Sequence, residues 1–113
     1  MIILGIDPGT AALGYGLVER TGPRLRAIDY GVITTSSRLP LPERLEAIYV
    51  AVTDLIELHA PAIVGVERLF FTRNAQTAFA VGQARGVVLA LPICSASPAT
   101  KALLLFRSRV KVL

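Results

Sequence analysis

Two short apolar runs in the chain each end in an acidic residue. Residues 1–7, MIILGID, stay apolar up to Asp7, and residues 62–67, AIVGVE, stay apolar up to Glu67. Short runs that are apolar on both faces are typical of strands in the middle of a sheet rather than at its edge. The hydrophobic pattern therefore predicts two central strands, each with a carboxylate at its C-terminal end.

The segment between these two runs predicts two further strands and a helix. Residues 13–20 and 25–34 alternate loosely, and a Thr-Gly-Pro break separates them, which favours an antiparallel meander with the first strand. Residues 41–60 then carry apolar side chains at helical spacing along one face. Pro42 in the first turn and Pro61 just past the end agree with these helix boundaries.

An Ala- and Gly-rich segment predicts the second helix. Asn74 is a good N-cap for residues 75–91, AQTAFAVGQARGVVLAL, which are apolar on most sides. We expect neighbours on two faces of this helix. Gly82 and Gly86 each cost a helix roughly 1 kcal/mol relative to Ala, and a close contact would explain their presence.

The C-terminal end of the chain follows a different pattern. Residues 91–113 contain a short apolar run, two prolines and scattered basic residues. This pattern suggests a strand at Leu91–Cys94 followed by a short, basic, amphipathic end. We therefore expect one folded core over residues 1–90 and a divergent basic tail over residues 91–113.

Composition limits the class of protein. A length of 113 residues, 53% of them hydrophobic, suits one globular domain. No apolar stretch approaches the roughly 20 residues of a bilayer span, and no basic region precedes the N-terminal apolar run as in a signal peptide. The single cysteine, Cys94, gives no disulfide framework. A reduced, cytoplasmic setting without a membrane partner fits these features best.

Charge divides the chain into two unequal parts. Residues 1–67 hold all eight acids and five of the twelve Lys and Arg residues, whereas residues 68–113 hold the other seven and no acid. This strongly basic second part permits contact with phosphate groups. Charged residues on solvent-exposed faces would give the same pattern, so charge alone does not assign a function.

The two acid-ended runs are the strongest candidate for chemistry. A helical crossover between the meander and residues 62–67 can place that strand parallel to the first, so Asp7 and Glu67 would meet at one edge of the sheet. A divalent cation, Mg²⁺ or Mn²⁺, would relieve the repulsion between them, and such sites serve attack of water on a phosphodiester. An isolated acid at a strand end is most often a solvated turn residue or a cap, and two such acids on the same sheet make a paired site and that ordinary role about equally favoured. The sequence offers no alternative catalytic set, because His59 and Cys94 are the only histidine and cysteine and no Walker-type loop is present.

At this point the residues resemble a known family. GIDPGT at 5–10, GYG at 14–16, VERLFFTRNAQTAFAVG at 66–82 and QARG at 83–86 are similar to the RuvC-type Holliday-junction resolvases. The resemblance covers about residues 1–90 and implies a ribonuclease H-like α/β fold. In that fold an antiparallel three-strand meander and parallel strands form one mixed sheet flanked by helices. It also implies a homodimeric endonuclease, linked to a branch-migration helicase, that nicks four-way DNA junctions with Mg²⁺ in recombination and repair.

The resemblance also implies roles for individual residues. Asp7 and Glu67 match the first two catalytic, metal-binding carboxylates, and Phe70 matches an aromatic residue that stacks at the junction centre. Arg73 and Arg85 would contact phosphates, and the Ala- and Gly-rich helix would supply a dimer contact. For Phe70 the alternative is packing in the core, and for both arginines it is a solvated surface position.

One departure from the family pattern concerns the acids. The family supplies further carboxylates, including an Asp pair on a last helix, whereas this chain has no Asp or Glu after Glu67. From about Leu91 the residues do not match the family, which suggests a truncated or frame-shifted product with a fold incomplete at its C-terminus. Within residues 1–66, Asp29 is the nearest third acid, and its strand position argues against reach. We therefore expect the 113-residue chain to be a poor or inactive nuclease.

Three other readings stay open. A non-catalytic DNA-binding module would use the basic part of the chain and Phe70, and its affinity would fall as salt rises. GID-x-GT also resembles the phosphate loop of actin-like ATPases and sugar kinases, where Asp7 would serve a Mg²⁺-nucleotide, although 113 residues are too few for such a protein. The last of these three readings is an unstable fragment with an exposed apolar sheet face.

Overall fold

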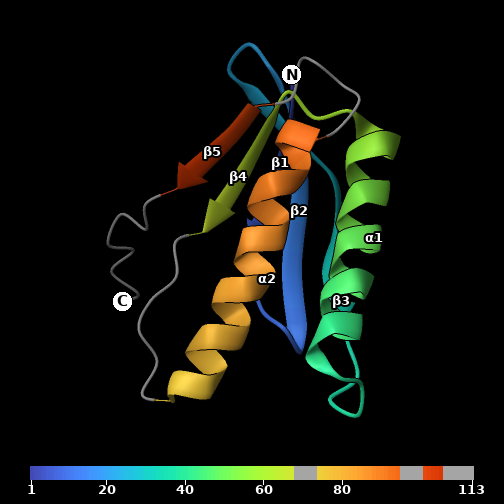
Figure 1. The fold of residues 1–113 in the computed structure, drawn as a ribbon. Coiled ribbons are helices and arrows are strands. Elements are labelled where there is room, and N and C mark those ends of the chain that lie inside the picture. Colours follow the sequence, from blue (N-terminus) through green and yellow to red (C-terminus); the bar gives the residue numbers. More distant parts are fainter. Residues whose placement is uncertain (68–73, 95–100, 106–113) are drawn as a thin grey trace, which may run out of the picture.

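A computed structural model describes residues 1–67, 74–94 and 101–105 of the chain (Figure 1). Its strands form one mixed sheet in the order β3-β2-β1-β4-β5, in which β1, β2 and β3 are antiparallel neighbours and β1, β4 and β5 are parallel. In chain order the elements are β1 (Ile2–Asp7), β2 (Ala12–Thr21), β3 (Arg24–Thr34), α1 (Leu41–His59), β4 (Ile63–Glu67), α2 (Ala75–Cys94) and β5 (Lys101–Leu105). The predicted meander, crossover helix and parallel central strands are confirmed.

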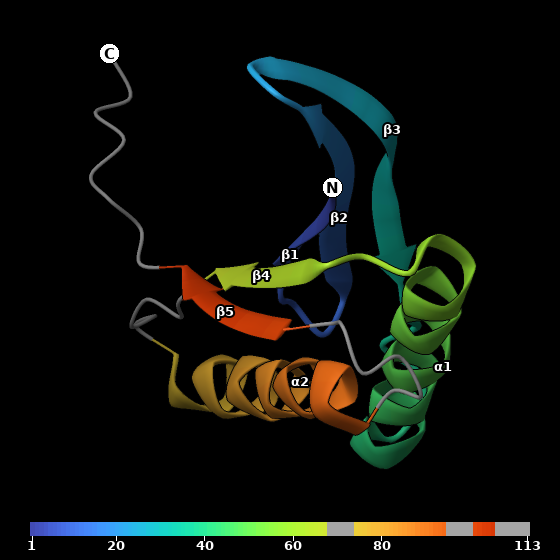
Figure 2. The ribbon, with the colours of Figure 1, turned by 90° about the horizontal axis from the view of Figure 1, so that it is seen from above.

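Both helices pack on the same face of the sheet (Figure 2). The buried strand residues line up across the register, as in the row Leu17, Leu4 and Val64. From the helices, the core receives Ile48, Val52, Ile56, Ala84, Val88 and Leu91. Each fully buried Leu, Ile or Val contributes about 1.5–3 kcal/mol, so this one layer holds the fold together. Within the described residues, the opposite face of the sheet carries no helix.

Helix α1 begins and ends where the sequence predicts. Pro40 precedes it without a side-chain cap, and the prediction of Pro42 in its first turn is correct. At the C-terminus the chain leaves the helix through Ala60, whose φ of 44° lies in the left-handed region that favours glycine. The Ala60 N–H still donates to the Ile56 carbonyl at 2.8 Å, and Pro61 follows as a fully buried residue.

Helix α2 confirms its predicted start but runs further than predicted. Asn74 caps it, because the Thr77 N–H donates to Asn74 Oδ1 at 3.3 Å. The strand predicted at Leu91–Cys94 is wrong, since these residues form the last turn of the helix. Leu91 continues the buried helical row of Val88, so packing against the sheet decides the conformation of this short apolar run.

The expected close contact on α2 is made on one side only. Its buried residues face α1 and the sheet, whereas Phe79 is 73% exposed. A Cβ atom added at Gly82 or Gly86 would meet nothing within 4 Å, so no described part of the chain uses their small size. Neither helix is long and apolar enough to cross a membrane.

Candidate metal and DNA site

Asp7 and Glu67 end adjacent parallel strands. The β1–β4 register pairs Ile6 with Val66, one position before each acid, so the two carboxylate residues come level at the same sheet edge. The sequence predicted this neighbourhood, and the strand order confirms it. Two negative charges at neighbouring strand ends repel each other, which makes this edge a place where a cation is favoured.

Both acids belong to the sheet face that the helices leave uncovered. Strand residues alternate in direction, and on β1 the acid shares its face with Gly5, not with the core residues Leu4 and Ile6. Gly5 pairs with Gly16 on one side and Gly65 on the other, so the three strands β2, β1 and β4 place no side chain in the row next to the acids. Asp7 is exposed and Glu67 is half-buried. A ligand can therefore approach the pair from this face.

The space beside Asp7 depends on two glycines. Across β2, Asp7 pairs with Gly14, where an added Cβ would lie 3.8 Å from the Asp7 Cβ. In the turn after Asp7, a Cβ at Gly9 would overlap the Ala12 carbonyl oxygen and lie 3.2 Å from the carbonyl carbon. The turn that follows the carboxylate thus closes tightly on itself, and only glycine fits at its second residue.

The donor set suits a hard divalent cation. Carboxylate oxygens are the ligands that Mg²⁺ and Mn²⁺ prefer, and Mg²⁺ commonly takes one or two of them together with water and phosphate oxygens. In the part of the chain that the structure describes, no group of three His, Cys, Asp or Glu residues is arranged to hold a metal. The edge therefore offers two protein ligands, Asp7 and Glu67, and leaves the other positions of a cation to solvent and substrate.

Asp29 does not serve as a third ligand, as its strand position predicts. It pairs with Leu17 on β2, which pairs with Leu4, three residues before Asp7. Its carboxylate has local partners instead: Tyr15 donates its hydroxyl to Oδ2 at 3.4 Å, and the Tyr30 N–H donates to Oδ1 at 2.8 Å. Desolvation and the Asp29 charge raise the pKa of Tyr15 above its usual 10.0, so the phenol keeps the proton that it donates.

Of the three residues expected to bind DNA, the structure describes one. Phe70 and Arg73 lie outside the described residues. Arg85 comes from the middle of α2, is half-buried, and donates Nε to the backbone carbonyl of Glu67 at 3.3 Å. The sequence left two roles open for Arg85, a phosphate contact or a solvated surface position. Its contact with the last residue of β4 is a further role, which only the packing of α2 under the sheet reveals.

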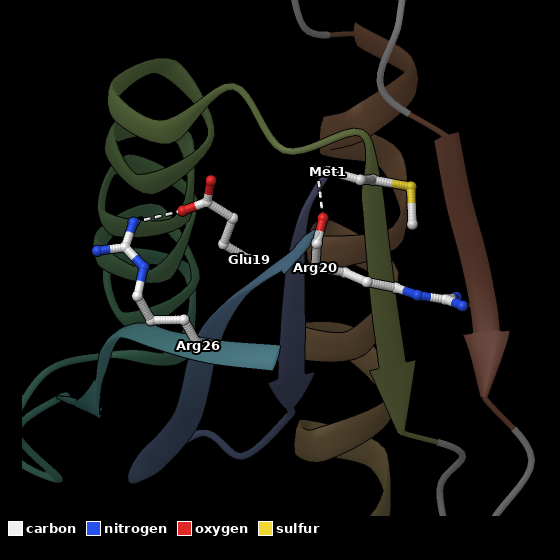
Figure 3. A network of polar contacts seen from close by, with 4 residues as sticks. All are labelled: Met1, Glu19, Arg20 and Arg26. Carbon is white, nitrogen blue, oxygen red and sulfur yellow. Dashed lines mark hydrogen bonds and ion pairs between the residues drawn. The ribbon is translucent and has the colours of Figure 1, made fainter. Parts of the chain in front are cut away.

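A separate polar cluster occupies the other end of the sheet, in the β2–β3 hairpin (Figure 3). The Met1 amino group donates to the Arg20 carbonyl at 2.8 Å, and Arg20 Nε donates to the Gly22 carbonyl at 3.1 Å. Arg26 forms an ion pair with Glu19. The hydrogen bond and the charge of Arg26 lower the pKa of Glu19 below its usual 4.5. This cluster fixes the N-terminus at the opposite end of β1 from Asp7.

Comparison with known sequences connects this arrangement to one family. Residues 3–97 match the profile of the family described as crossover junction endodeoxyribonuclease RuvC. Curated proteins of that description from Brevibacillus brevis and Desulfitobacterium hafniense are 51% and 54% identical to the chain over 89 residues. The match takes in 79% of this chain and 54% of each relative. The chain thus spans about half the length of the curated relatives it matches.

Solved structures lead to the same family. The structure described as T. thermophilus RuvC in complex with Holliday junction substrate superposes with a TM-score of 0.79 at 33% sequence identity. The superposition covers 93% of this chain and 66% of that chain. The mixed sheet with its two helices therefore matches the fold of a protein that was solved with Holliday junction substrate.

Proposed function

Because the chain belongs to the crossover junction endodeoxyribonuclease RuvC family, we propose that it provides two of the carboxylates with which such a nuclease cuts four-way junction DNA. The observation that carries the proposal is the β1–β4 register, which brings Asp7 and Glu67 to one open sheet edge. The same family assignment favours a nuclease over the actin-like nucleotide-binding reading. The reaction is hydrolysis of a phosphodiester bond in recombination and repair.

Asp7 and Glu67 would hold the cation in this proposal, with Mg²⁺ as the natural ion and Mn²⁺ as a substitute. A divalent cation supplies Lewis-acid stabilisation of the phosphate and a water molecule of lowered pKa. The chain's own part is to hold two carboxylates side by side on strand ends. The Arg85 bond to the Glu67 carbonyl supports the strand end on the β4 side.

The proposed DNA contacts use the basic part of the chain. Residues 68–113 carry seven Lys and Arg residues and no acid, which suits a polyanionic partner. Phe70 would stack at the open centre of the junction, and Arg73 and the other guanidinium donors of Arg85 would bind phosphates. Binding with this charge distribution should weaken steeply as the salt concentration rises.

We propose a homodimer through the face of α2 that the other described residues leave exposed. Phe79, Gly82, Gln83, Gly86 and Ala90 recur at helical spacing and are exposed or half-buried. An exposed Phe beside two glycines allows a second copy of the helix to approach closely. Two copies would present two cation sites to the paired strands of a junction. A branch-migration helicase complex is the proposed partner of the dimer, and a protein acting there would work in the cytoplasm with the chromosomal DNA.

Binding without cleavage is the second candidate for the 113-residue chain by itself. The observation that favours it is the number of acids at the sheet edge, since among the described residues two carboxylates, Asp7 and Glu67, meet there. A two-carboxylate site would hold a cation weakly. We therefore expect the chain to bind a junction and to cut it poorly at ordinary Mg²⁺ concentrations.

A junction-binding assay tests the proposal. A fluorescent synthetic four-way junction and a linear duplex of the same composition are titrated with the chain at several salt concentrations, without divalent cation. Preference for the junction and a steep salt dependence are expected. Equal affinity for both DNAs, or no binding, would contradict the proposed substrate. Cleavage is then followed in Mg²⁺ and in Mn²⁺, with Asp7→Asn as the matched control, and efficient cutting by the variant would contradict the role of Asp7.

A further inference from the structure

The turn between β1 and β2 has little apolar burial to hold it. It comprises residues 8–11, directly after Asp7, and its residues are half-buried except for Ala11, which is exposed. Its residues are absent from the core cluster. A segment with few buried contacts opens at low free-energy cost unless hydrogen bonds hold it. What fixes this turn therefore decides how firmly the backbone on the C-terminal side of Asp7 is placed.

Thr35 fixes the turn with two hydrogen bonds. It follows the last residue of β3, and its N–H donates to the Ala11 carbonyl at 3.1 Å, one step beyond the final β2–β3 pair of Ala12 and Thr34. Its hydroxyl Oγ1 then donates to the carbonyl of Thr10. The two bonds hold consecutive carbonyls, so they extend the sheet into the turn.

Arg44 sets the direction of the Thr35 hydroxyl. It lies in the first turn of α1, and its Nε donates to Thr35 Oγ1 at 3.0 Å. A hydroxyl has one proton to donate and lone pairs to accept with. Because Oγ1 accepts from a cationic group, its own proton is left for Thr10, and the charged donor strengthens that second bond. A relay from α1 through Thr35 thus reaches the turn that follows Asp7.

We propose that Thr35 and Arg44 are positioning residues, which lock the turn after Asp7 and so hold its carboxylate in place relative to Glu67. The inference rests on the proposed cation-binding role of Asp7. The other strand end has a corresponding support, the Arg85 bond to the Glu67 carbonyl. Each of the two carboxylate-bearing strand ends is therefore tied to a helix by an arginine, Arg44 from α1 and Arg85 from α2.

The test compares variants of Thr35 with a matched change elsewhere. Thr35→Val removes the hydroxyl and keeps the backbone bond, whereas Thr35→Ser restores the hydroxyl. Thr53→Val is the control, because Thr53 Oγ1 is buried and has no hydrogen-bond partner among the described residues. Arg44→Met removes the donor to Thr35 Oγ1 and so tests the same relay if Thr35→Val folds poorly. Mn²⁺ affinity is measured from the electron paramagnetic resonance signal of free Mn²⁺, and amide hydrogen exchange is measured at residue 35.

The expected pattern separates a positioning role from a general loss of stability. Thr35→Val and Arg44→Met should weaken Mn²⁺ binding, by up to about tenfold, and should speed amide exchange at residue 35. Thr35→Ser and Thr53→Val should leave both values near those of the unmodified chain. Equal Mn²⁺ affinity in Thr35→Val and the unmodified chain would overturn the positioning role and leave the proposed cation site standing. If the unmodified chain binds Mn²⁺ no better than Asp7→Asn, the proposed cation site fails and the inference fails with it.

Discussion

Gly9 offers the sharpest test of how the turn after Asp7 is built. A Cβ at this position would overlap the Ala12 carbonyl oxygen and would lie 3.2 Å from the carbonyl carbon and 3.8 Å from the Ala12 nitrogen. All three atoms are backbone, so no rotamer change relieves the clash in Gly9→Ala. The turn itself must open, and forced displacements of this kind cost about 1–3 kcal/mol. We expect a loss of about 2 kcal/mol in the free energy of unfolding.

Two other glycines of the sheet provide controls for Gly9. A Cβ at Gly16 meets nothing within 4 Å, so Gly16→Ala should be neutral or stabilising by up to about 1 kcal/mol through the unfolded state. A Cβ at Gly31 would lie 2.9 Å from the Tyr15 hydroxyl oxygen, which is the end of a side chain that can move. Gly31→Ala should therefore fall between the other two variants in stability.

The assay is urea unfolding followed by circular dichroism, with Mn²⁺ affinity measured on the same samples. For a domain of this size, 2 kcal/mol corresponds to a fall of roughly 10 °C in the thermal midpoint. Gly9→Ala should also weaken Mn²⁺ binding, because the opened turn starts directly after Asp7. A Gly9→Ala variant as stable as Gly16→Ala, with unchanged Mn²⁺ affinity, would show that the tight turn does not place the carboxylate.

Three further predictions concern stability. Ala60→Gly should raise the free energy of unfolding in urea by about 1 kcal/mol, because Ala60 has a φ of 44°. Ala47→Gly inside α1 should lower it by about as much. A change of the same sign in both variants would contradict this prediction. Thr53→Val should raise the free energy of unfolding by about 1 kcal/mol, and with it the thermal midpoint, because it removes a buried hydroxyl with no partner among the described residues. A lower thermal midpoint would argue against this. Since Arg26 lowers the pKa of Glu19 below 4.5, their ion pair stabilises the fold above that pH and is lost as the pH falls through the lowered value. The difference in thermal midpoint between the unmodified chain and Arg26→Gln should therefore shrink below pH 4.5, and a constant difference would contradict the assignment.

Local sequence patterns predicted most of the elements because each has a local cause. The alternation of β2 and β3, the apolar face of α1 and the Asn74 cap are all properties of neighbouring residues. The adjacency of Asp7 and Glu67 followed from one additional rule, that a helical crossover returns the chain as a parallel strand. That rule and two apolar runs were enough to bring two residues 60 positions apart to one edge.

The failures all concern contacts between distant segments. Leu91–Cys94 is equally compatible with a strand and a helix in sequence, and the burial of Leu91 beside the sheet selects the helix. Strand β5 follows a break in the pattern and pairs parallel to β4, which no local signal indicates.

The polar supports of the site were missed for the same reason. The bonds of Thr35 to the Asp7 turn, and of Arg85 to the Glu67 carbonyl, depend on register and helix packing. The only trace that they leave in the sequence is a polar residue just past a strand or within an apolar helix. The roles of Phe70 and Arg73 in DNA binding stay predictions.

Paramagnetic broadening by Mn²⁺ tests the paired-carboxylate site most directly. Substoichiometric Mn²⁺ is added to the isotopically labelled chain, and amide signals are compared before and after the addition. Broadening should centre on Asp7 and Glu67, spare the β2–β3 hairpin end around Gly22, and disappear in Asp7→Asn. Broadening that centres on the acids of α1, or that persists unchanged in Asp7→Asn, would contradict a cation site at the shared edge of β1 and β4.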